Sequence, residues 1–339
     1  MKPELSEQLF IDQLVTKSID QKKLDCHARL DLEKLTGDAS TRRYYRQRCK
    51  EDSYVICLDN PVDEKENSFT AIQKFLHSKD IRVPKIFDQD LSKGYILEED
   101  LGNVTLLKRL STVTSALDEY NLYEGVIELL MGLHNLELAD VKETLVSERF
   151  FDEQKLFSEV EFTTKHFLKG YLGVKAKQVI SKIESDFKAI CQKLASGDMV
   201  FTHRDFHSRN LMLKNGELVL IDFQDARMGL PQYDLSSLLD DCYYDLDRSN
   251  RYKLIKLYYE SRKGSLNQSY DHFLETYEYM AIQRIYKAIG SFSYIFALRG
   301  DHRYLKYIGF GMEKLRKKMI KFKELEGLAE TLFEIYYDH

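Results

Sequence analysis

The hydrophobic pattern of the first hundred residues changes from helical to strand-like. Three leucines repeat at helical spacing and predict a short amphipathic helix over residues 5–15. A second helix is expected within 66–80, and Pro84 then restarts an extended segment. Strands rich in Tyr, Val, Ile and Leu are expected at 28–36, 41–49, 53–59 and 94–98. The N-terminal part is therefore predicted to be a small sheet accompanied by helices.

After about residue 102 the pattern becomes mostly helical. The clearest helix is expected at 180–194, where apolar residues recur every three or four positions. The other helices are expected at 117–131, 157–167, 235–246, 250–263, 270–292, 303–319 and 325–337. The segment LEEDLGN at 97–103 suits an exposed connector, which divides the chain into domains 1–101 and 102–339. The predicted fold class is α+β.

The only strand signal within the helical part lies in HRDFHSRNLMLKNGELVLIDFQD, residues 203–225. An Asn-Gly pair at 215–216 stands between two short apolar runs. This pair favours the type I′ turn of a β-hairpin, because both central residues of that turn take positive φ. The hairpin is expected to bring Asn210, just before its first strand, near Asp222, just after its second. Asp205 lies on the loop that leads in.

These three side chains have the chemistry of phosphoryl transfer. Asn210 and Asp222 offer oxygen ligands to Mg²⁺, which takes one or two carboxylates together with substrate phosphates. Asp205 is placed to accept the proton of a hydroxyl nucleophile. The order H-x-D-x-x-x-x-N, hairpin, D-F-x is that of a kinase catalytic loop. Each residue alone is more often a cap or turn residue, but the combination with a strand-rich region upstream indicates catalysis.

This motif resembles that of the aminoglycoside phosphotransferase family, which has a bilobal, protein-kinase-like fold. Further stretches resemble the bacterial subgroup that phosphorylates the anomeric hydroxyl of N-acetylmuramate and N-acetylglucosamine. They are LTGDASTRRYYR at 35–46, GYILEEDLG at 94–102, RFFDEQKLFSEVEFTTKHFLKGYLG at 149–173 and YDLSSLLDDCYYD at 233–245. The resemblance implies a small antiparallel-sheet N-lobe that binds the nucleotide. It also implies a larger, mostly helical C-lobe that holds the catalytic loop and the sugar pocket.

The resemblance implies a role for each residue of the catalytic loop. Asp205 would be the general base, and Asn210 and Asp222 would hold Mg²⁺. His203 is expected to be a buried histidine that supports the loop backbone. For His207 two alternatives stay open, support of the loop or contact with the substrate.

Nucleotide binding is implied for the N-lobe. The turn from Gly37 to Thr41 would cover the ATP phosphates, with the hydroxyls of Ser40 and Thr41 among its donors. The backbone of Glu98 and Asp100 would meet the adenine edge. Both acids also fit an ordinary exposed linker, so their side chains do not decide between the two interpretations.

One departure from protein kinases concerns the cation that grips the phosphates. Protein kinases carry a Lys on the third strand, whereas this strand reads Tyr-Val-Ile-Cys-Leu at 54–58. Arg43 on the second strand and Lys65 before the helix are the alternatives, and either also fits a solvated surface charge. The missing Lys is also what a nucleotide-binding pseudokinase would show.

The sugar pocket is expected to lie in the helical lobe. The residues expected to line it are His207, Tyr233, Asp234 and Asp240. Asp234 fits equally well as the N-cap of the helix expected at 235. His166 stands where the resembling subgroup often has an aromatic residue.

Composition narrows the class of protein further. The net charge of −5 gives no basic surface for nucleic acid, and no apolar run approaches the length of a membrane span. The N-terminus has acids and no long apolar core, so no secretory signal is expected. The five cysteines are odd in number and scattered, which predicts neither a zinc site nor a disulfide framework. A cytoplasmic monomer is expected.

The function favoured by these observations is that of an ATP- and Mg²⁺-dependent sugar kinase. It would phosphorylate the anomeric hydroxyl of N-acetylmuramate, N-acetylglucosamine or both, in peptidoglycan recycling. A kinase for another small hydroxyl acceptor, such as an aminoglycoside, choline or homoserine, is the first alternative. A pseudokinase is the second, although the presence of all three acidic and amide groups argues against it.

Overall fold

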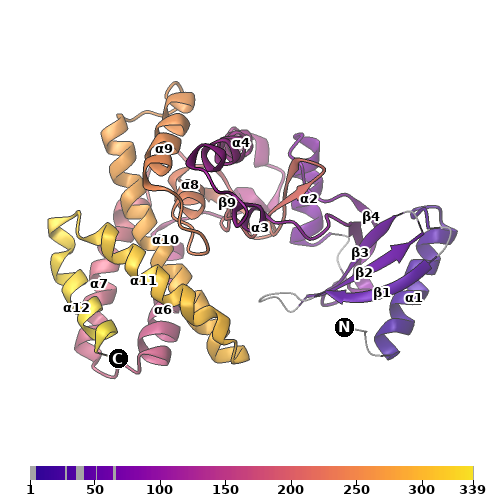
Figure 1. The fold of residues 1–339 in the computed structure, drawn as a ribbon, viewed down its shortest axis with the longest axis horizontal. Helices are drawn as coiled ribbons and strands as arrows, with labels where there is room; N and C mark the ends of the chain where they lie inside the picture. The colour runs from indigo at the N-terminus through magenta and orange to yellow at the C-terminus, as the bar shows by residue number, and fades with distance from the viewer. Residues whose placement is uncertain (1–4, 27–28, 36–41, 51, 64–65, 339) are drawn as a thin grey trace. The chain divides into compact units, whose positions relative to one another are not determined.

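The computed structural model describes residues 5–26, 29–35, 42–50, 52–63 and 66–338 (Figure 1). The chain divides into two compact units. Unit 1 comprises the residues up to Val104 together with 212–224, and unit 2 comprises 105–211 together with 225 to the C-terminus. Within the described part of the chain, no helix is both long enough and apolar enough to span a lipid bilayer.

Unit 1 contains a five-stranded antiparallel sheet in the order β1-β2-β3-β5-β4. Its strands are β1 (Arg29–Leu35), β2 (Arg43–Cys49), β3 (Ser53–Leu58), β4 (Ile86–Asp90) and β5 (Tyr95–Glu99). The helices are α1 (Leu5–Asp20) and α2 (Ser68–Ser78), with a 3₁₀ turn at Leu91–Lys93. The four strands expected from the sequence are all present. The segment after Pro84 forms β4, an additional strand at the edge of the sheet.

The two faces of this sheet differ in chemistry. Successive side chains of a strand point to opposite faces, and helix α1 covers one face of the sheet (Figure 1). The apolar side chains of α1 pack on that face. There Val15 of α1 packs in one cluster with Tyr45 of β2 and Ile56 of β3. The next position along β2 is Arg46, which is therefore on the other face, and is buried as well. The second face thus contains buried charge, which requires partners within the protein.

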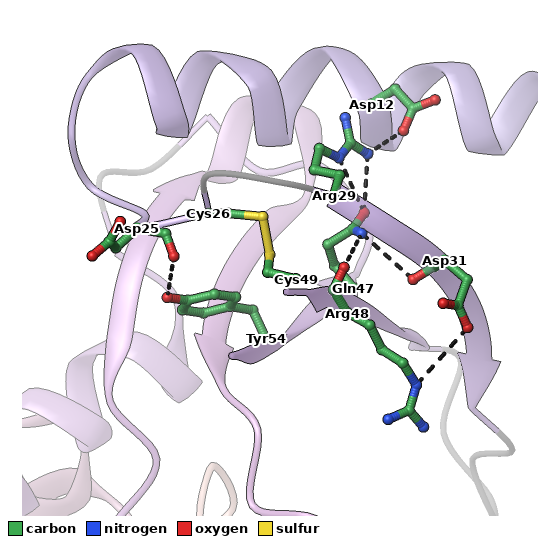
Figure 2. Close-up of a disulfide and its surroundings, with 9 residues drawn as sticks. All are labelled: Asp12, Asp25, Cys26, Arg29, Asp31, Gln47, Arg48, Cys49 and Tyr54. Atoms are coloured by element: carbon green, nitrogen blue, oxygen red, sulfur yellow. Dashed lines mark hydrogen bonds and ion pairs between the residues drawn. A yellow bond between two sulfur atoms is a disulfide. The ribbon is translucent and has the colours of Figure 1, made fainter. Parts of the chain in front are cut away.

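A disulfide joins Cys26 to Cys49, so the expectation that no disulfide forms was wrong (Figure 2). Cys49 ends β2 and lies opposite Arg29, the first residue of β1. Strand pairing therefore brings the segment before β1 next to Cys49. Beside the disulfide, Tyr54 donates a hydrogen bond from its hydroxyl to the Asp25 carbonyl (3.0 Å). The sequence spacing of 23 residues carries no sign of this pairing, because it arises from the register of the sheet.

The predicted hairpin is confirmed as β7 (Leu211–Lys214) and β8 (Glu217–Leu220). Asn215 and Gly216 have φ of 54° and 86°, as a type I′ turn requires. Met212 and Val219 form a small apolar cluster with Leu101, a residue in the segment that follows β5. The hairpin thereby belongs to unit 1.

Unit 2 is built around α10 (Tyr270–Arg299), which packs against α6, α7, α8 and α11. Its other helices are α3 (Leu106–Leu110), α4 (Ala116–His134), α5 (Leu138–Val141), α6 (Glu153–Thr163), α7 (Lys177–Leu194), α8 (Gln232–Leu239), α9 (Arg248–Arg262), α11 (Leu305–Met319) and α12 (Glu326–Tyr337). A π-helical segment at Thr164–Tyr171 continues α6. Short 3₁₀ turns lie at Leu145–Glu148, His302–Tyr304 and Lys323–Leu325. The prediction of a mostly helical C-terminal part is confirmed.

Two details of unit 2 differ from the sequence-based expectation. A two-stranded sheet formed by β6 (Val200–Thr202) and β9 (Arg227–Gly229) had not been expected. Strands of three residues are too short to show a period of two. In addition, α8 ends at Leu239, although the apolar spacing continues to Leu246. The residues after Leu239 instead form a bend, and this bend begins with Asp240 and Asp241.

Candidate active site

The loop after β6 is held rigidly by α8. His203 is fully buried, and its Nδ1 accepts a hydrogen bond from the Asp205 backbone N–H (3.2 Å), so its predicted structural role is confirmed. The carboxylate of Asp234 accepts from the backbone N–H groups of His203 (2.5 Å) and Arg204 (3.0 Å). Arg204 has a φ of 83°, which turns the chain sharply. These bonds determine where the next residue, Asp205, presents its side chain.

Three cations surround the Asp205 carboxylate. Lys287 of α10 donates a hydrogen bond to Oδ1 (2.6 Å), and Arg284 lies one helical turn earlier, 3.6 Å from the same oxygen. The Arg204 Nε is 4.0 Å from Oδ2. Burial alone would raise the pKa of Asp205, but the three positive charges hold it well below its usual range. Asp205 is therefore ionised at neutral pH and ready to accept a hydrogen bond from a hydroxyl.

A cavity of about 500 Å³ within unit 2 opens onto Asp205. Helices α6, α8 and α10 contribute most of its wall. The wall contains the hydroxyl groups of Ser158, Ser236, Ser237, Tyr243 and Ser291, and the aromatic rings of Phe162, Tyr243 and Phe292. A cavity of this size with many hydrogen-bonding groups suits a small polar molecule.

The residues predicted for the sugar pocket fall into two groups. His207 and Asp240 line the cavity. Tyr233 and Asp234 are fully buried behind it and are absent from its wall. Asp234 is also not the N-cap of α8, which begins at Gln232, because its carboxylate holds the catalytic loop as described above. Of the four, only His207 and Asp240 are therefore positioned to meet a ligand in this cavity.

Glu159 of α6 connects the charged residues of the wall. Its Oε2 accepts from the Tyr233 hydroxyl (3.0 Å), and its Oε1 is 3.6 Å from both Lys155 and Arg204. Helix α6 can approach α10 closely because α10 has a glycine at position 290. A Cβ there would lie 2.3 Å from Thr163 Oγ1. This close approach brings the charges of α6 and α10 to the same cavity.

The two predicted Mg²⁺ ligands lie in different units. Asn210, in unit 2, donates from its side-chain nitrogen to the Asp205 carbonyl (3.0 Å), which sets the orientation of its amide. Asp222, in unit 1, has a φ of 66° and accepts from the Gln224 side chain (2.8 Å). An amide and a carboxylate oxygen are ligands that suit Mg²⁺. Their convergence on one ion stays a prediction, and the described residues contain no cluster of three His, Cys, Asp or Glu side chains able to hold a metal.

The residues predicted to bind the nucleotide are described only in part. Gly37, Ser40, Thr41 and Lys65 lie outside the described residues. Arg43 is half exposed and donates to Glu7 of α1 (2.7 Å), so its side chain is on the apolar, α1-covered face of the sheet.

Arg42, which directly precedes β2, lies on the opposite face of the sheet, the face that also contains Arg46. Arg42 pairs with Asp59 (2.8 Å) and lies over the ring of Phe69 in α2 (5.4 Å from its centroid). Glu98 and Asp100 are both buried, and the carboxylate of Asp100 is bound by Arg46. Contact of their backbones with adenine stays a prediction.

Sequence analysis missed the cations of the wall, namely Lys155, Arg284 and Lys287. The last two are separated from Asp205 by about eighty residues, so spacing could not connect them. A signal does exist in the sequence. Arg284 and Lys287 are three residues apart in a helix whose residues from 277 to 292 are mostly apolar or aromatic, with Glu278, Gln283 and Ser291 as the other polar positions. Charges at such positions are rare in a core unless they have partners.

Known proteins with a similar sequence or a similar fold include several small-molecule kinases. The chain is 29% identical to the N-acetylmuramate/N-acetylglucosamine kinase of Neisseria meningitidis serogroup B, over 91% of each chain. Its fold is similar to that of choline kinase LicA from Streptococcus pneumoniae, with a TM-score of 0.60 and 15% identity over 91% of this chain and 99% of that one.

A similar fold is found in ADP-bound aminoglycoside phosphotransferase APH(2'')-Ib, with a TM-score of 0.59 and 18% identity over 90% and 97% of the two chains. The fold is thus protein-kinase-like. Residues 31–265 match the model of the phosphotransferase enzyme family. The chain therefore belongs to the phosphotransferase enzyme family and is a small-molecule kinase.

Proposed function

We propose that this kinase transfers the γ-phosphoryl group of ATP to the anomeric hydroxyl of N-acetylmuramate, N-acetylglucosamine or both. The observation that carries the proposal is the ionised Asp205 at the wall of a polar cavity of about 500 Å³. The similarity to the Neisseria kinase over nearly the whole chain supports the same acceptor class. The product, a sugar 1-phosphate, fits a role in peptidoglycan recycling.

An anomeric hydroxyl suits the base that this structure offers. It is more acidic than an ordinary alcohol, because the ring oxygen withdraws electrons. A carboxylate whose pKa is held low by cations is a weak base, and a weak base is sufficient for an acidic hydroxyl. The same cations, Lys287 and Arg284, would stabilise negative charge that develops on the acceptor oxygen.

The cations closest to Asp205 argue against an acceptor with a positive charge beside its reacting hydroxyl. The cavity as a whole has a mixed wall, with the cations Lys155, Arg204, Arg284 and Lys287 and the carboxylates Glu159, Asp205, Asp240 and Asp241. A positive charge held near Arg284 and Lys287 would be repelled. The anomeric hydroxyl of an amino sugar meets no such penalty.

ATP and Mg²⁺ are the proposed cofactors. Asn210 and Asp222 would hold the ion, which would neutralise phosphate charge. The loop bonds around Asn210 and Asp205 would keep both oriented before the substrates bind. A cytoplasmic, monomeric enzyme stays a prediction.

A coupled ADP-release assay over a panel of acceptors tests the proposal. We expect Mg²⁺-dependent turnover with N-acetylmuramate or N-acetylglucosamine, and ³¹P and ¹H NMR should place the phosphate on the anomeric carbon. Turnover with kanamycin or choline but with neither amino sugar would overturn the acceptor assignment. Tight ATP binding without transfer to any acceptor would favour the pseudokinase alternative.

A further inference from the structure

The catalytic loop is tied to α8 and the bend that follows it at two points. In the first turn of α8, Asp234 binds the backbone that leads into Asp205, as described above. Beyond the end of α8, one oxygen of Asp241, Oδ2, accepts from the backbone N–H (3.0 Å) and from the hydroxyl (2.5 Å) of Ser208. The part of the loop between these two points contains Asp205 and His207, so both ends of that part are held by carboxylates.

The other oxygen of Asp241 holds a second part of the cavity wall. Oδ1 accepts from the backbone N–H of Tyr243 (2.8 Å). Tyr243 and His207 both line the cavity, and their rings meet edge to face with centroids 5.3 Å apart. His207 directly precedes Ser208 in the chain. One carboxylate therefore holds the backbone beside each of these two rings.

His207 depends on this anchor more than Tyr243 does. The ring of Tyr243 also packs against Phe292 (5.4 Å between centroids) and Tyr307 (4.8 Å). By contrast, Nδ1 of His207 is buried and has no hydrogen-bond partner among the described residues. The position of the imidazole is thus determined mainly by the backbone that carries it and by its contact with Tyr243.

The neighbouring carboxylate, Asp240, has a different role. It pairs with Lys318 of α11 (2.6 Å) and Arg251 of α9 (3.4 Å), and accepts from the hydroxyl of Tyr277 in α10 (2.6 Å). Asp240 therefore joins three helices of unit 2. The hydrogen bonds to the side chain of Asp241 within the described part of the chain come from neutral donors of the loop and the bend. Asp241 thus serves the loop and not the packing of the helices.

We infer that Asp241 is a positioning residue for acceptor binding, which acts through Ser208 to hold the ring of His207 in the wall of the acceptor cavity. This inference rests on the part of the proposed function that places the acceptor in this cavity. It deepens that proposal by naming what keeps this part of the wall in place before the acceptor binds.

The general base has its own supports, so the two effects can be separated. Asp205 is held by the bonds of Asp234 to the preceding backbone and by Lys287, which donates to its carboxylate (2.6 Å). Loss of the Asp241 anchor should therefore weaken acceptor binding, measured as the acceptor KM, more than it slows the chemical step, measured as kcat.

His207 has the chemistry to contact a neutral polar acceptor. Burial lowers its pKa, and Asp241 and Asp205 offset only part of this effect, so the ring is neutral at pH 7. A neutral imidazole has one N–H donor and one acceptor nitrogen. Its placement therefore matters for a ligand that carries hydroxyl and amide groups.

Ser208 distinguishes positioning from direct contact. Asp241 itself lines the cavity, so a substitution there could remove a contact with the acceptor. Ser208 is fully buried and is absent from the wall, and therefore cannot touch the acceptor. An effect of Ser208→Ala on acceptor binding must pass through the residues that Ser208 holds in place.

The test measures acceptor KM, ATP KM and kcat for the wild type, Asp241→Asn and Ser208→Ala, with an acceptor that the wild type phosphorylates. In Asp241→Asn one oxygen becomes an NH₂ group, which cannot accept from a backbone N–H, so the acceptor KM should rise about tenfold. Ser208→Ala removes one hydrogen bond and should raise it about threefold. ATP KM and kcat should change less than about twofold. Asp245→Asn, at an exposed position of the same bend, is the matched control and should resemble the wild type.

A double-mutant cycle shows whether the effect passes through His207. Ser208→Ala should raise the acceptor KM in the wild-type background but have little further effect in His207→Ala, because residues that act through one another are not additive. Ser208→Ala removes only a hydroxyl, so it provides the test even if Asp241→Asn fails to fold, which an unfolding curve would reveal.

Three results would overturn the inference and leave the proposed function intact. Additive increases of KM in the Ser208→Ala/His207→Ala variant would show that Ser208 acts elsewhere. A fall in kcat with unchanged acceptor KM would make Asp241 a support of the base or of the fold. Wild-type kinetics in Ser208→Ala would mean that the anchor has no part in acceptor binding. Turnover of acceptors other than the two sugars would instead remove the proposed function, and the same measurements would then be made with that acceptor.

Discussion

Two buried clusters of charge, one in each unit, are built in opposite ways. In unit 1, Arg46 donates from Nε and Nη2 to the two oxygens of Asp100 (2.7 and 2.8 Å). Ser53 and the Gly102 N–H complete the acceptor capacity of that carboxylate, at 2.6 and 2.9 Å. In unit 2, the cluster around Asp205 contains buried polar atoms without hydrogen-bond partners among the described residues, namely the Nε donors of Arg204 and Arg284 and the Oε1 acceptor of Glu159. The first is complete without a ligand, and the second is not.

This difference separates structural charge from functional charge. A complete buried pair joins segments of the chain, here β2 to the segment after β5, and gains nothing from a ligand. An incomplete cluster is destabilising by itself, so its retention beside a cavity indicates that a ligand completes it. Burial alone would not distinguish the two cases, because both contain charged side chains that are mostly shielded from water.

The largest expected effect is on turnover in Asp205→Asn. The amide cannot accept the acceptor proton, so kcat should fall about 10²- to 10⁴-fold. The protein should stay folded, because Lys287 beside it faces the cavity and can be hydrated. Steady-state ADP release and a urea unfolding curve of the same preparation provide the measurement. Wild-type turnover in this variant would remove Asp205 from the mechanism.

Asp100→Asn should have the opposite profile, a loss of stability. It leaves the buried guanidinium of Arg46 without a counter-charge, which costs about 3–5 kcal/mol in unfolding free energy. The double variant Arg46→Met/Asp100→Leu removes both charges and should cost less than the single change. Urea unfolding monitored by circular dichroism measures both. If Asp100→Asn were as stable as the wild type, the Arg46–Asp100 pair would have no structural role, and the contrast between the two clusters would fail.

The sequence predicted most helices and strands, but few of the contacts between residues that are distant along the chain. Helices and strands depend on local patterns, whereas distant contacts depend on how the elements pack. The catalytic loop and hairpin are local, so the order of His203, Asp205, Asn210 and the Asn-Gly turn was enough to predict them. Two of the three cations beside Asp205, Arg284 and Lys287, come from a helix about eighty residues away, and their positions follow from how α10 packs. Similarly, Cys26 meets Cys49 only through the register of β1 and β2. Local spacing contains neither relationship.

The disulfide should stabilise unit 1 by restricting the unfolded chain, an effect that is independent of charge. It closes a loop over a sequence separation of 23 residues, and such loops restrict the unfolded chain by about 3–4 kcal/mol. In protein purified without reductant, Cys26→Ser/Cys49→Ser should lose about this much unfolding free energy. Reduction of the wild type by dithiothreitol should reproduce the loss. Equal stability of the oxidised, reduced and double-Ser forms would exclude a stabilising role.

Glu98 of β5 tests an intermediate case, a buried carboxylate with one nearby cation. Burial raises its pKa from 4.5 to about 7, and Arg42 offsets only part of this rise. Between pH 4.5 and about 7 the folded protein therefore keeps a proton on Glu98 that the unfolded chain releases. The stabilising contribution of the neutral acid is complete below pH 4.5. It is lost as the pH rises through about 7, with a total of about 3 kcal/mol.

Glu98→Gln should remove this dependence, since the amide does not titrate. Urea unfolding of both proteins at intervals between pH 5 and pH 8 measures it, and the variant should gain relative to the wild type as the pH rises. Glu128→Gln at an exposed position of α4 is a suitable control, because it makes the same chemical change far along the chain from Arg42. Parallel pH profiles for wild type and Glu98→Gln would show that Arg42 neutralises Glu98 fully. The polar face of the sheet would then be as complete as the Arg46–Asp100 pair, and incomplete charge would be confined to the cavity of unit 2.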